Sequence, residues 1–301
     1  MNSKIKTISI VFLVLINFSL FNSLIIAGEN YSNSISKMSS LTSCLENKKN
    51  IYIKLSLYIE SLIFLYPDGR KEIFLSQDPE KIAKTLAIAV EKFEFINLNF
   101  LVDKVHLIEK EIKCVDEKDR DRELVTFITS KCFDGIDEEM VSISEKNKDS
   151  MNLFFCFVVD FNILGLSSHP YIMPGSFIFM STIKENDITL THEMGHYFGL
   201  LHTFNDGGDM CDDTVDGNLD HSLLGTDADP NKLNIMTYTK DHECVDELFF
   251  SENQKELIIS NLFNPSRLRQ LILFSSNNKN NNIIGKDWEI NLNVLLKMIE
   301  K

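Results

Sequence analysis

The chain has 301 residues, of which 44 are acidic and 30 are basic, so its formal net charge is −14. Nucleic acids and anionic membrane surfaces bind basic patches, and the excess of acidic residues argues against both as main partners. The length is ample for one domain with a full hydrophobic core.

Residues 1–27 have the pattern of a secretory signal peptide. Lys4 and Lys6 form a positive n-region, an apolar stretch follows, and the small residue Ala27 offers a cleavage point. An uncleaved signal anchor is the alternative, because the apolar stretch approaches the length that spans a bilayer. We expect a secreted or cell-envelope protein that has no membrane contact once this segment is removed.

Segment 28–50 is rich in Ser and Asn and is interpreted as a leader or short pro-segment. Hydrophobic alternation then predicts a strand over 51–60. Asp78 and Pro79 predict an N-cap with proline at the first helical position, followed by a helix to about residue 93.

The next segments alternate between strand patterns and charged sequence. A strand is predicted over 94–109, and the charged stretch 115–150 is interpreted as containing an inserted helix and loop. The near-continuous apolar run 151–165 predicts a strand that is covered on both faces. Another strand is predicted over 176–180, directly before the most informative motif of the chain.

That motif reads H-E-x-x-H-x-x-G-x-x-H and ends at His202. His192 and His196 are four residues apart, so a helix places both imidazoles on the same face. Gly199 can adopt a left-handed backbone and end the helix, which lets His202 reach the same ion. Three histidine ligands leave one zinc position open, as is typical of a catalytic site.

Glu193 follows the first histidine and is placed to hydrogen-bond a water at the metal and to act as its base. A buried amphipathic helix with incidental histidines is the alternative, but it does not account for the fixed spacing of five residues. A structural zinc site is disfavoured, because the motif offers no fourth ligand.

An acidic loop follows the motif. Hard oxygen ligands in a flexible loop suit calcium, and a solvated acidic loop is the competing interpretation. The acids in question are Asp206, Asp209, Asp212, Asp213, Asp216 and Asp220.

The segment Asn234-Ile235-Met236-Thr237-Tyr238 follows the acidic loop. A methionine turn beneath zinc histidines is the second signature of the metzincins, which the chain thus resembles. The resemblance implies that Met236 forms the hydrophobic floor of the site and that Tyr238 donates a hydrogen bond to the oxyanion. The alternative is a core methionine beside a half-buried tyrosine.

The chain ends with a predicted helix and a tail. Ser251 to Gln254 form a capping box at the start of the helix, and Pro265 follows its end. Segment 275–301 is interpreted as an asparagine-rich linker and a tail that docks as one more helix. The catalytic domain is expected to cover 51–274.

Over about residues 150–260 the chain resembles the pappalysin (cytophagalysin) family of metzincins. The family pattern H-E-x-G-H-x-x-G-L-x-H-T-F is complete through Thr203 and Phe204, and the G-D-x-x-x-D-T segment runs from Gly208 to Thr214. Val215 departs from the pattern, because the family usually has proline there.

The resemblance implies an α+β fold, in which a twisted mixed sheet and an active-site helix lie above a mostly irregular C-terminal subdomain. The edge strand of the sheet is expected near 166–174, where an extended substrate would add to it. His169 is interpreted as a turn residue beside this edge. The resemblance also implies a Cys211–Cys244 disulfide and favours a structural calcium ion in the acidic loop.

Disulfides are permissible in an exported chain, and an even number of cysteines allows full pairing. Beyond the pair implied by the resemblance, Cys114–Cys132 is a local hypothesis and Cys156 is interpreted as a buried thiol. Cys44 is interpreted as structural or free rather than as an inhibitory zinc ligand. The six cysteines are at 44, 114, 132, 156, 211 and 244.

These patterns together predict a secreted zinc endopeptidase that acts on protein or peptide substrates. His192, His196 and His202 would hold zinc, Glu193 would act as the base, and Tyr238 would stabilise the oxyanion. The alternative function is a non-catalytic exported binding protein on a metzincin scaffold. Retention of Glu193 argues against that alternative.

Overall fold

Two long parallel strands, β1 (Ile51–Leu65) and β3 (Leu98–Lys113), form the centre of the fold in the computed structural model. They pair along their full lengths, with one register shift at Leu55/Ser56. Most residues of β1 are buried, including the polar Ser56, Glu60 and Ser61, so the strand is covered on both faces. The predicted strand at 51–60 is therefore confirmed, and it continues to Leu65.

The structure describes residues 43, 46–47, 49–130, 138–157, 164–169, 173–181, 188–205, 208–215, 223–238, 242–262, 271–273 and 283–299. Segment Lys48–Lys301 forms one compact unit, and Met1–Asn47 belongs to another, of which only three residues are described. The predicted signal peptide and the cysteines at 44 and 132 lie outside the described residues. Among the residues that are described, no helix has both the length and the apolar character needed to cross a bilayer.

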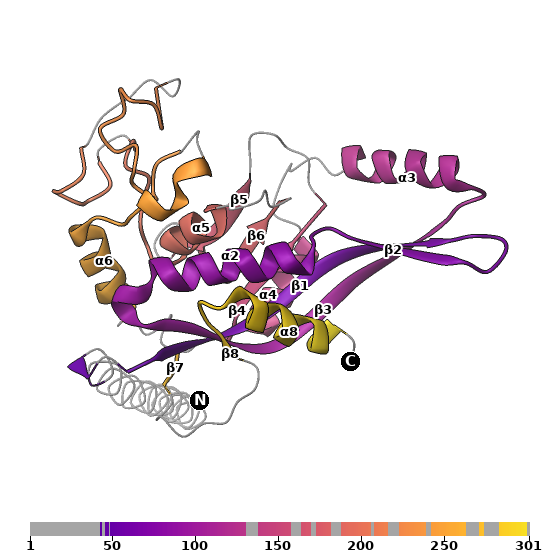
Figure 1. The fold of residues 1–301 in the computed structure, drawn as a ribbon, viewed down its shortest axis with the longest axis horizontal. Coiled ribbons are helices and arrows are strands. Elements are labelled where there is room, and N and C mark those ends of the chain that lie inside the picture. Colours follow the sequence, from indigo (N-terminus) through magenta and orange to yellow (C-terminus); the bar gives the residue numbers. More distant parts are fainter. Residues whose placement is uncertain are drawn as a thin grey trace, which may run out of the picture. The chain divides into compact units, whose positions relative to one another are not determined.

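The sheet is mixed, and within the described ranges its strand order is β5-β6-β4-β1-β3-β8. Strands β4 (Met151–Phe155) and β6 (Met173–Met180) run parallel to β1, whereas β5 (Gly165–His169) pairs antiparallel with β6 and forms one end of the sheet. Strand β8 (Ile283–Ile284) pairs antiparallel with β3. The predicted α+β fold with a twisted mixed sheet is confirmed (Figure 1).

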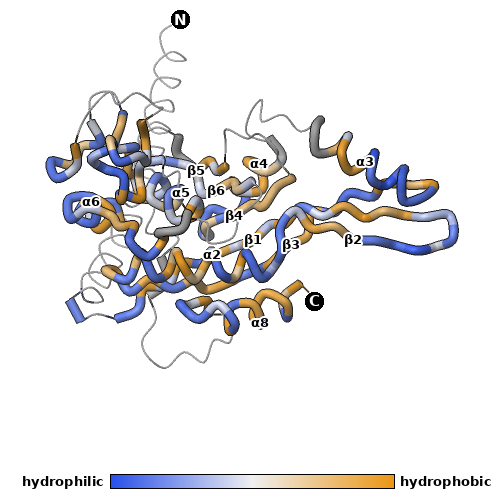
Figure 2. The backbone as a smooth tube through the Cα atoms, turned by 45° about the horizontal axis from the view of Figure 1, so that its top comes forward, coloured by the Kyte–Doolittle hydropathy of each residue, from blue (hydrophilic) through white to orange (hydrophobic). Residues whose placement is uncertain are grey.

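Two short strands pair with the two ends of β1. Strand β2 (Lys71–Leu75) forms a hairpin with the end of β1, and β7 (Leu271–Leu273) pairs with its beginning. In Figure 2 the central strands β4 and β6 are hydrophobic and the tip of the β1–β2 hairpin is hydrophilic. The buried part of the sheet thus lies where β1 and β4 pair.

Helix α2 (Pro79–Lys92) begins as the sequence predicts. The Asp78 side chain accepts a hydrogen bond from the Glu80 amide at 2.9 Å, and Pro79 occupies the first turn. The helix lies against the sheet, with α5 (Thr189–Tyr197) beside it and α8 (Trp288–Ile299) packed on it (Figure 1). The predicted C-terminal helix of the tail is therefore present as α8.

Several strand boundaries differ from the sequence predictions. The strand after α2 begins at Leu98 rather than at 94, because a 3-10 turn, η1 (Glu94–Ile96), comes first and Asn97 adopts a left-handed backbone. The strand predicted over 151–165 ends at Phe155, and the edge strand starts at Gly165 rather than at 166. Met173 and the residue after it belong to β6 and not to the edge.

The charged insertion contains two helices, α3 (Glu117–Ser130) and α4 (Glu138–Lys146). After α5 the described chain is irregular until α6 (Glu252–Leu262), apart from the 3-10 turn η2 (His242–Glu247). An aromatic cluster joins these parts, because the ring of Phe93 lies 5.4 Å from that of Phe198 and 5.1 Å from that of Phe250. The end of α2, the end of α5 and the start of α6 therefore share one core.

Candidate active site

Helix α5 carries the first two histidines of the motif and is buried along nearly its whole length. Its last turn ends at Phe198, after which Gly199 has a φ of 97° and Leu200 donates its amide to the carbonyl of Gly195 at 2.9 Å. A side chain at position 199 would oppose this backbone conformation. The reversal of the chain at Gly199 brings His202 back toward the helix.

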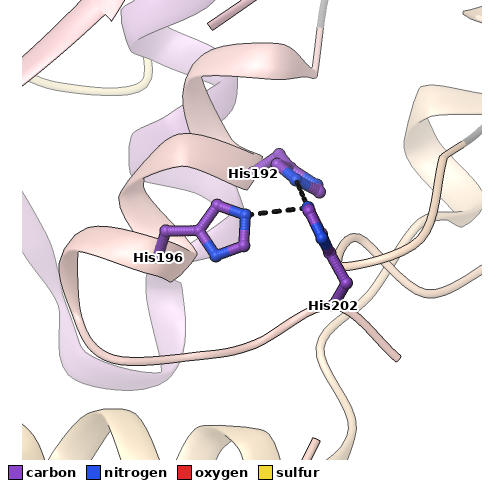
Figure 3. A group of neighbouring side chains, drawn as sticks. All are labelled: His192, His196 and His202. Carbon is purple, nitrogen blue, oxygen red and sulfur yellow. Dashed lines mark hydrogen bonds between the residues drawn. The ribbon is translucent and has the colours of Figure 1, made fainter. Parts of the chain in front are cut away.

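The three histidines meet through their Nε2 atoms (Figure 3). Nε2 of His202 lies 3.1 Å from Nε2 of His192 and 3.0 Å from Nε2 of His196. Two nitrogens on one tetrahedral zinc ion would be about 3.3 Å apart, given Zn–N bonds of about 2.0–2.1 Å. The spacing of the three donors therefore fits a single small cation.

Backbone carbonyls hold the other ring nitrogen of two of these histidines. His192 Nδ1 donates to the carbonyl of Ile235 at 2.7 Å, and His196 Nδ1 donates to that of Leu200 at 2.8 Å. A proton fixed on Nδ1 leaves the lone pair of Nε2 free for a metal. Burial lowers the pKa of His192. Burial, together with the repulsion that a proton on neighbouring His192 would cause, lowers the pKa of His196 to about 3, so both rings favour the neutral form that binds metal.

Glu193 lies on the same helix, with only 6% of its surface exposed. Its side chain packs against Gly165 of the edge strand β5. Burial raises the pKa of Glu193 to about 8, and hydrogen bonding to the Ser167 hydroxyl acts in the opposite direction. A carboxyl group with this environment can take up and release a proton near neutral pH.

Met236 is fully buried and packs against helix α5. A Cβ atom built at Gly195 would collide with the Met236 sulfur, so the helix and the methionine turn are in direct contact. The turn is closed by Asn234, whose side-chain oxygen accepts the Met236 amide at 2.8 Å and whose carbonyl accepts the Thr237 amide at 3.2 Å. Met236 thus forms an apolar surface on the side of α5 that bears Gly195.

A chain of buried amides and carboxylates supports this turn. The Asn234 amide donates to Gln254 of α6 at 3.0 Å, and the Gln254 amide donates to Asp209 at 3.1 Å. Asp209 also accepts the Thr214 hydroxyl at 2.6 Å. The loop after His202, the methionine turn and α6 are therefore joined by one hydrogen-bonded network.

Tyr238 and Phe204 lie beside the third histidine. The ring of Phe204 stacks on His202 at 4.6 Å, and the half-exposed ring of Tyr238 lies 5.0 Å from His202 and 6.1 Å from His192. Burial and the Glu193 carboxylate raise the pKa of Tyr238, which keeps its phenol protonated and able to donate. The assignment of Tyr238 to the oxyanion stays a prediction.

The described acids of the loop do not support the predicted calcium site. Both carboxylate oxygens of Asp209 already accept hydrogen bonds, and Asp213 accepts the hydroxyl of Ser251 and the amide of Asn253. In the part of the chain that the structure describes, the three histidines are the only group of His, Cys, Asp or Glu side chains close enough to share an ion. Three of the six acids, including Asp206, lie outside the described residues.

The predicted disulfides stay untested. Cys211 is buried, but the side chain of Cys244 lies outside the described residues, as does Cys132. Cys114 and Cys156 are also buried. His169, interpreted as a turn residue, is instead part of β5, where it pairs with Met173.

Sequence reasoning missed Gly165 and Ser167, which face Glu193 from the edge strand, and Gln254, which links the methionine turn to the acidic loop. The sequence signal for Gly165 is a glycine in an otherwise apolar strand pattern, which often marks close approach of another group. Gln254 carries no such signal, because its capping-box position explains it locally.

The mixed sheet, the helix with two histidines and a carboxylate, the third histidine after a glycine turn and the methionine turn together resemble the metzincin class of metalloprotease domains. Comparison with known sequences agrees. Residues 168–263 match the profile of peptidase family M43, the pappalysin family, described as pregnancy-associated plasma protein-A. The family resemblance of the motifs is thus confirmed over that segment.

Two curated fungal proteins are similar to part of the chain. Each is called extracellular metalloprotease, one from Arthroderma benhamiae and one from Trichophyton verrucosum, and each is 33% identical over 95 residues. The match covers 24% of this chain and 32% of each relative. The chain therefore spans about a third of the length of these relatives.

Proposed function

We propose that the protein is a secreted zinc endopeptidase. The observation that carries this proposal is the convergence of three Nε2 atoms beside a buried glutamate on the same helix. Neutral imidazoles with Nδ1 held by carbonyls suit zinc, and His192, His196 and His202 would be its ligands. When bound there, zinc would polarise the scissile carbonyl and acidify a water molecule.

The side chains of the chain itself supply the proton transfers. Glu193 takes the proton of the attacking water and passes it to the leaving amine, since its burial keeps the affinity for a proton high. The protonated phenol of Tyr238 donates to the oxyanion as negative charge develops on it. The hydroxyl is carried on a half-exposed ring beside His202, where substrate has access.

Strand β5 offers the substrate a place to bind. It lies at the end of the sheet and, among the described strands, pairs only with β6. Its unpaired backbone groups can bind an extended peptide as one more strand, which positions the scissile bond without need of a particular sequence. Gly165 of this strand lies against Glu193, so a peptide bound there is held next to the base.

The test compares the purified chain with Glu193→Ala on a mixed peptide library, with the zinc content of both proteins measured. We expect cleavage by the parent, a loss of about 10²–10⁴-fold in the variant and equal zinc, because Glu193 moves protons and is not a ligand. The matched control is Glu109→Ala, which removes an exposed glutamate of β3 and should leave cleavage unchanged.

The other outcomes separate the alternatives. Zinc in both proteins without cleavage by either would favour the non-catalytic binding protein. Absence of zinc from the parent would contradict the assignment of the three histidines, since no other described group of side chains can replace them.

A further inference from the structure

The two faces of the edge strand β5 differ sharply. Leu166 packs into the apolar cluster that contains Phe154 and Phe179. Because side chains alternate along a strand, Gly165 and Ser167 project to the opposite face, toward α5. On the face of β5 nearest Glu193, Gly165 therefore has no side chain and Ser167 has only a small hydroxyl-bearing one.

The fit of Glu193 against Gly165 leaves no room for a side chain. A Cβ atom at Gly165 would lie 2.6 Å from Cγ, 2.9 Å from Cδ and 2.8 Å from Oε1 of Glu193. Gly165 does not have a positive φ, so its backbone conformation is open to other residues. The conformation therefore does not explain why a glycine is present here. A glycine inside a strand weakens it, and the space taken by Glu193 accounts for its presence here.

Ser167 gives a second, independent observation. It is 5% exposed, and its hydroxyl makes no well-formed hydrogen bond to another described residue. The Ser167 hydroxyl interacts with the Glu193 carboxyl group, acting to lower its pKa, and can donate a hydrogen bond to it. A buried hydroxyl is costly unless it has a partner, and the carboxylate is the partner that the geometry supplies.

We propose that Gly165 and Ser167 are positioning residues that seat the carboxylate of Glu193 against β5. The inference rests on the proposed function, because Glu193 is there the base of the reaction. Gly165 provides the space and Ser167 fixes the orientation of the carboxylate oxygens. A base acts only within hydrogen-bonding reach, and a displacement of about 1 Å can lower a rate about 10²-fold.

The first test is Gly165→Ala. The atoms that the new methyl group would meet are Cγ, Cδ and Oε1 of the Glu193 side chain and not backbone atoms, so the carboxylate should move while the backbone stays in place. We expect kcat to fall about 10²-fold, with zinc content and melting temperature unchanged. The matched control is Gly285→Ala, where the nearest atom is Asn99 Oδ1 at 3.4 Å and no effect on activity is expected.

A double-mutant cycle separates positioning from general damage. If Gly165 acts through Glu193, Gly165→Ala should have no further effect on the residual activity of Glu193→Ala. Ser167→Ala adds no volume and removes one hydrogen bond to the carboxylate. We expect it to lower kcat about 5-fold and to leave KM unchanged. Additive losses in the cycle would overturn the proposal, since a structural defect acts in either background.

Crystal structures of the parent and Gly165→Ala give a readout that does not depend on activity. The proposal expects the Glu193 carboxylate to be displaced while the three histidines stay in place. An unmoved carboxylate would overturn it. If the parent cleaves no peptide, the proposed function fails, but the crystallographic comparison still decides whether Gly165 seats Glu193.

Discussion

Gly195 is the residue on which the contact between α5 and the methionine turn depends. A Cβ atom there would collide with the Met236 sulfur and lie 3.3 Å from Met236 Cε and 3.4 Å from Phe250 Cε1. Both neighbours are buried, so neither can move into solvent. Close packing at this point limits position 195 to glycine even though its backbone is helical.

We therefore expect Gly195→Ala to destabilise the protein. Helix propensity alone would favour alanine by about 1 kcal/mol, whereas overpacking a core costs about 1–3 kcal/mol. Urea unfolding of the metal-free protein measures the difference. The loss should shrink in a Met236→Ala background, where the sulfur is absent, and a gain of stability in the parent background would contradict the contact.

For single residues, the sequence predicts those roles that depend on neighbours a few positions away. The positions of His192 and His196 follow from one helical turn, and the reversal at Gly199 follows from its backbone freedom. The roles inferred for Gly165 and Ser167 could not be predicted, because Gly165 and Glu193 are 28 positions apart and meet only when β5 lies beside α5. Local patterns carry no information about such a contact.

Among the elements, α6 depends on an acid from the distant loop. Asp213 accepts the Ser251 hydroxyl at 2.6 Å and the Asn253 amide at 3.0 Å, so its carboxylate caps the start of the helix. Burial acts to raise the pKa of Asp213, but these hydrogen bonds outweigh it and the pKa is lowered. The carboxylate form is thus favoured by the folded state.

This depressed pKa makes a prediction about pH. The stabilisation by Asp213 should be fully present above the unfolded pKa of about 3.9 and be lost as pH falls through the lower folded pKa. The stability difference between the parent and Asp213→Asn should therefore shrink on acidification from pH 7. Urea midpoints of the two proteins across this range test it, and a constant difference would exclude the charge as the cause.

The elements also show where sequence patterns fail. The run 151–165 predicts one strand because a strand buried on both faces has no alternation to mark its end, and β4 stops at Phe155. Strand β2 is short and has no fully buried residue, and β8 has only two residues, so neither is long enough to show a periodic apolar pattern. By contrast, Asp78 and Pro79 predict the start of α2 because capping is local.

For the whole molecule, export is the property that the N-terminus predicts. We expect the protein recovered outside the producing cell to begin at Gly28, since cleavage after Ala27 removes the charged and apolar regions together. Mass spectrometry of the intact secreted protein measures this. A chain that still begins at Met1 and stays with the membrane fraction would instead support the signal anchor.

The network through Gln254 has a consequence for the order in which the site is completed. A nascent chain that has emerged only as far as Tyr238 contains all three histidines, Glu193 and Met236. It lacks the side chain that joins Asn234 to Asp209, and it lacks β7 and β8, which pair with the two central strands. Every proposed ligand is thus synthesised before Gln254, so the hydrogen-bonded network around the methionine turn can close only after α6 has been made.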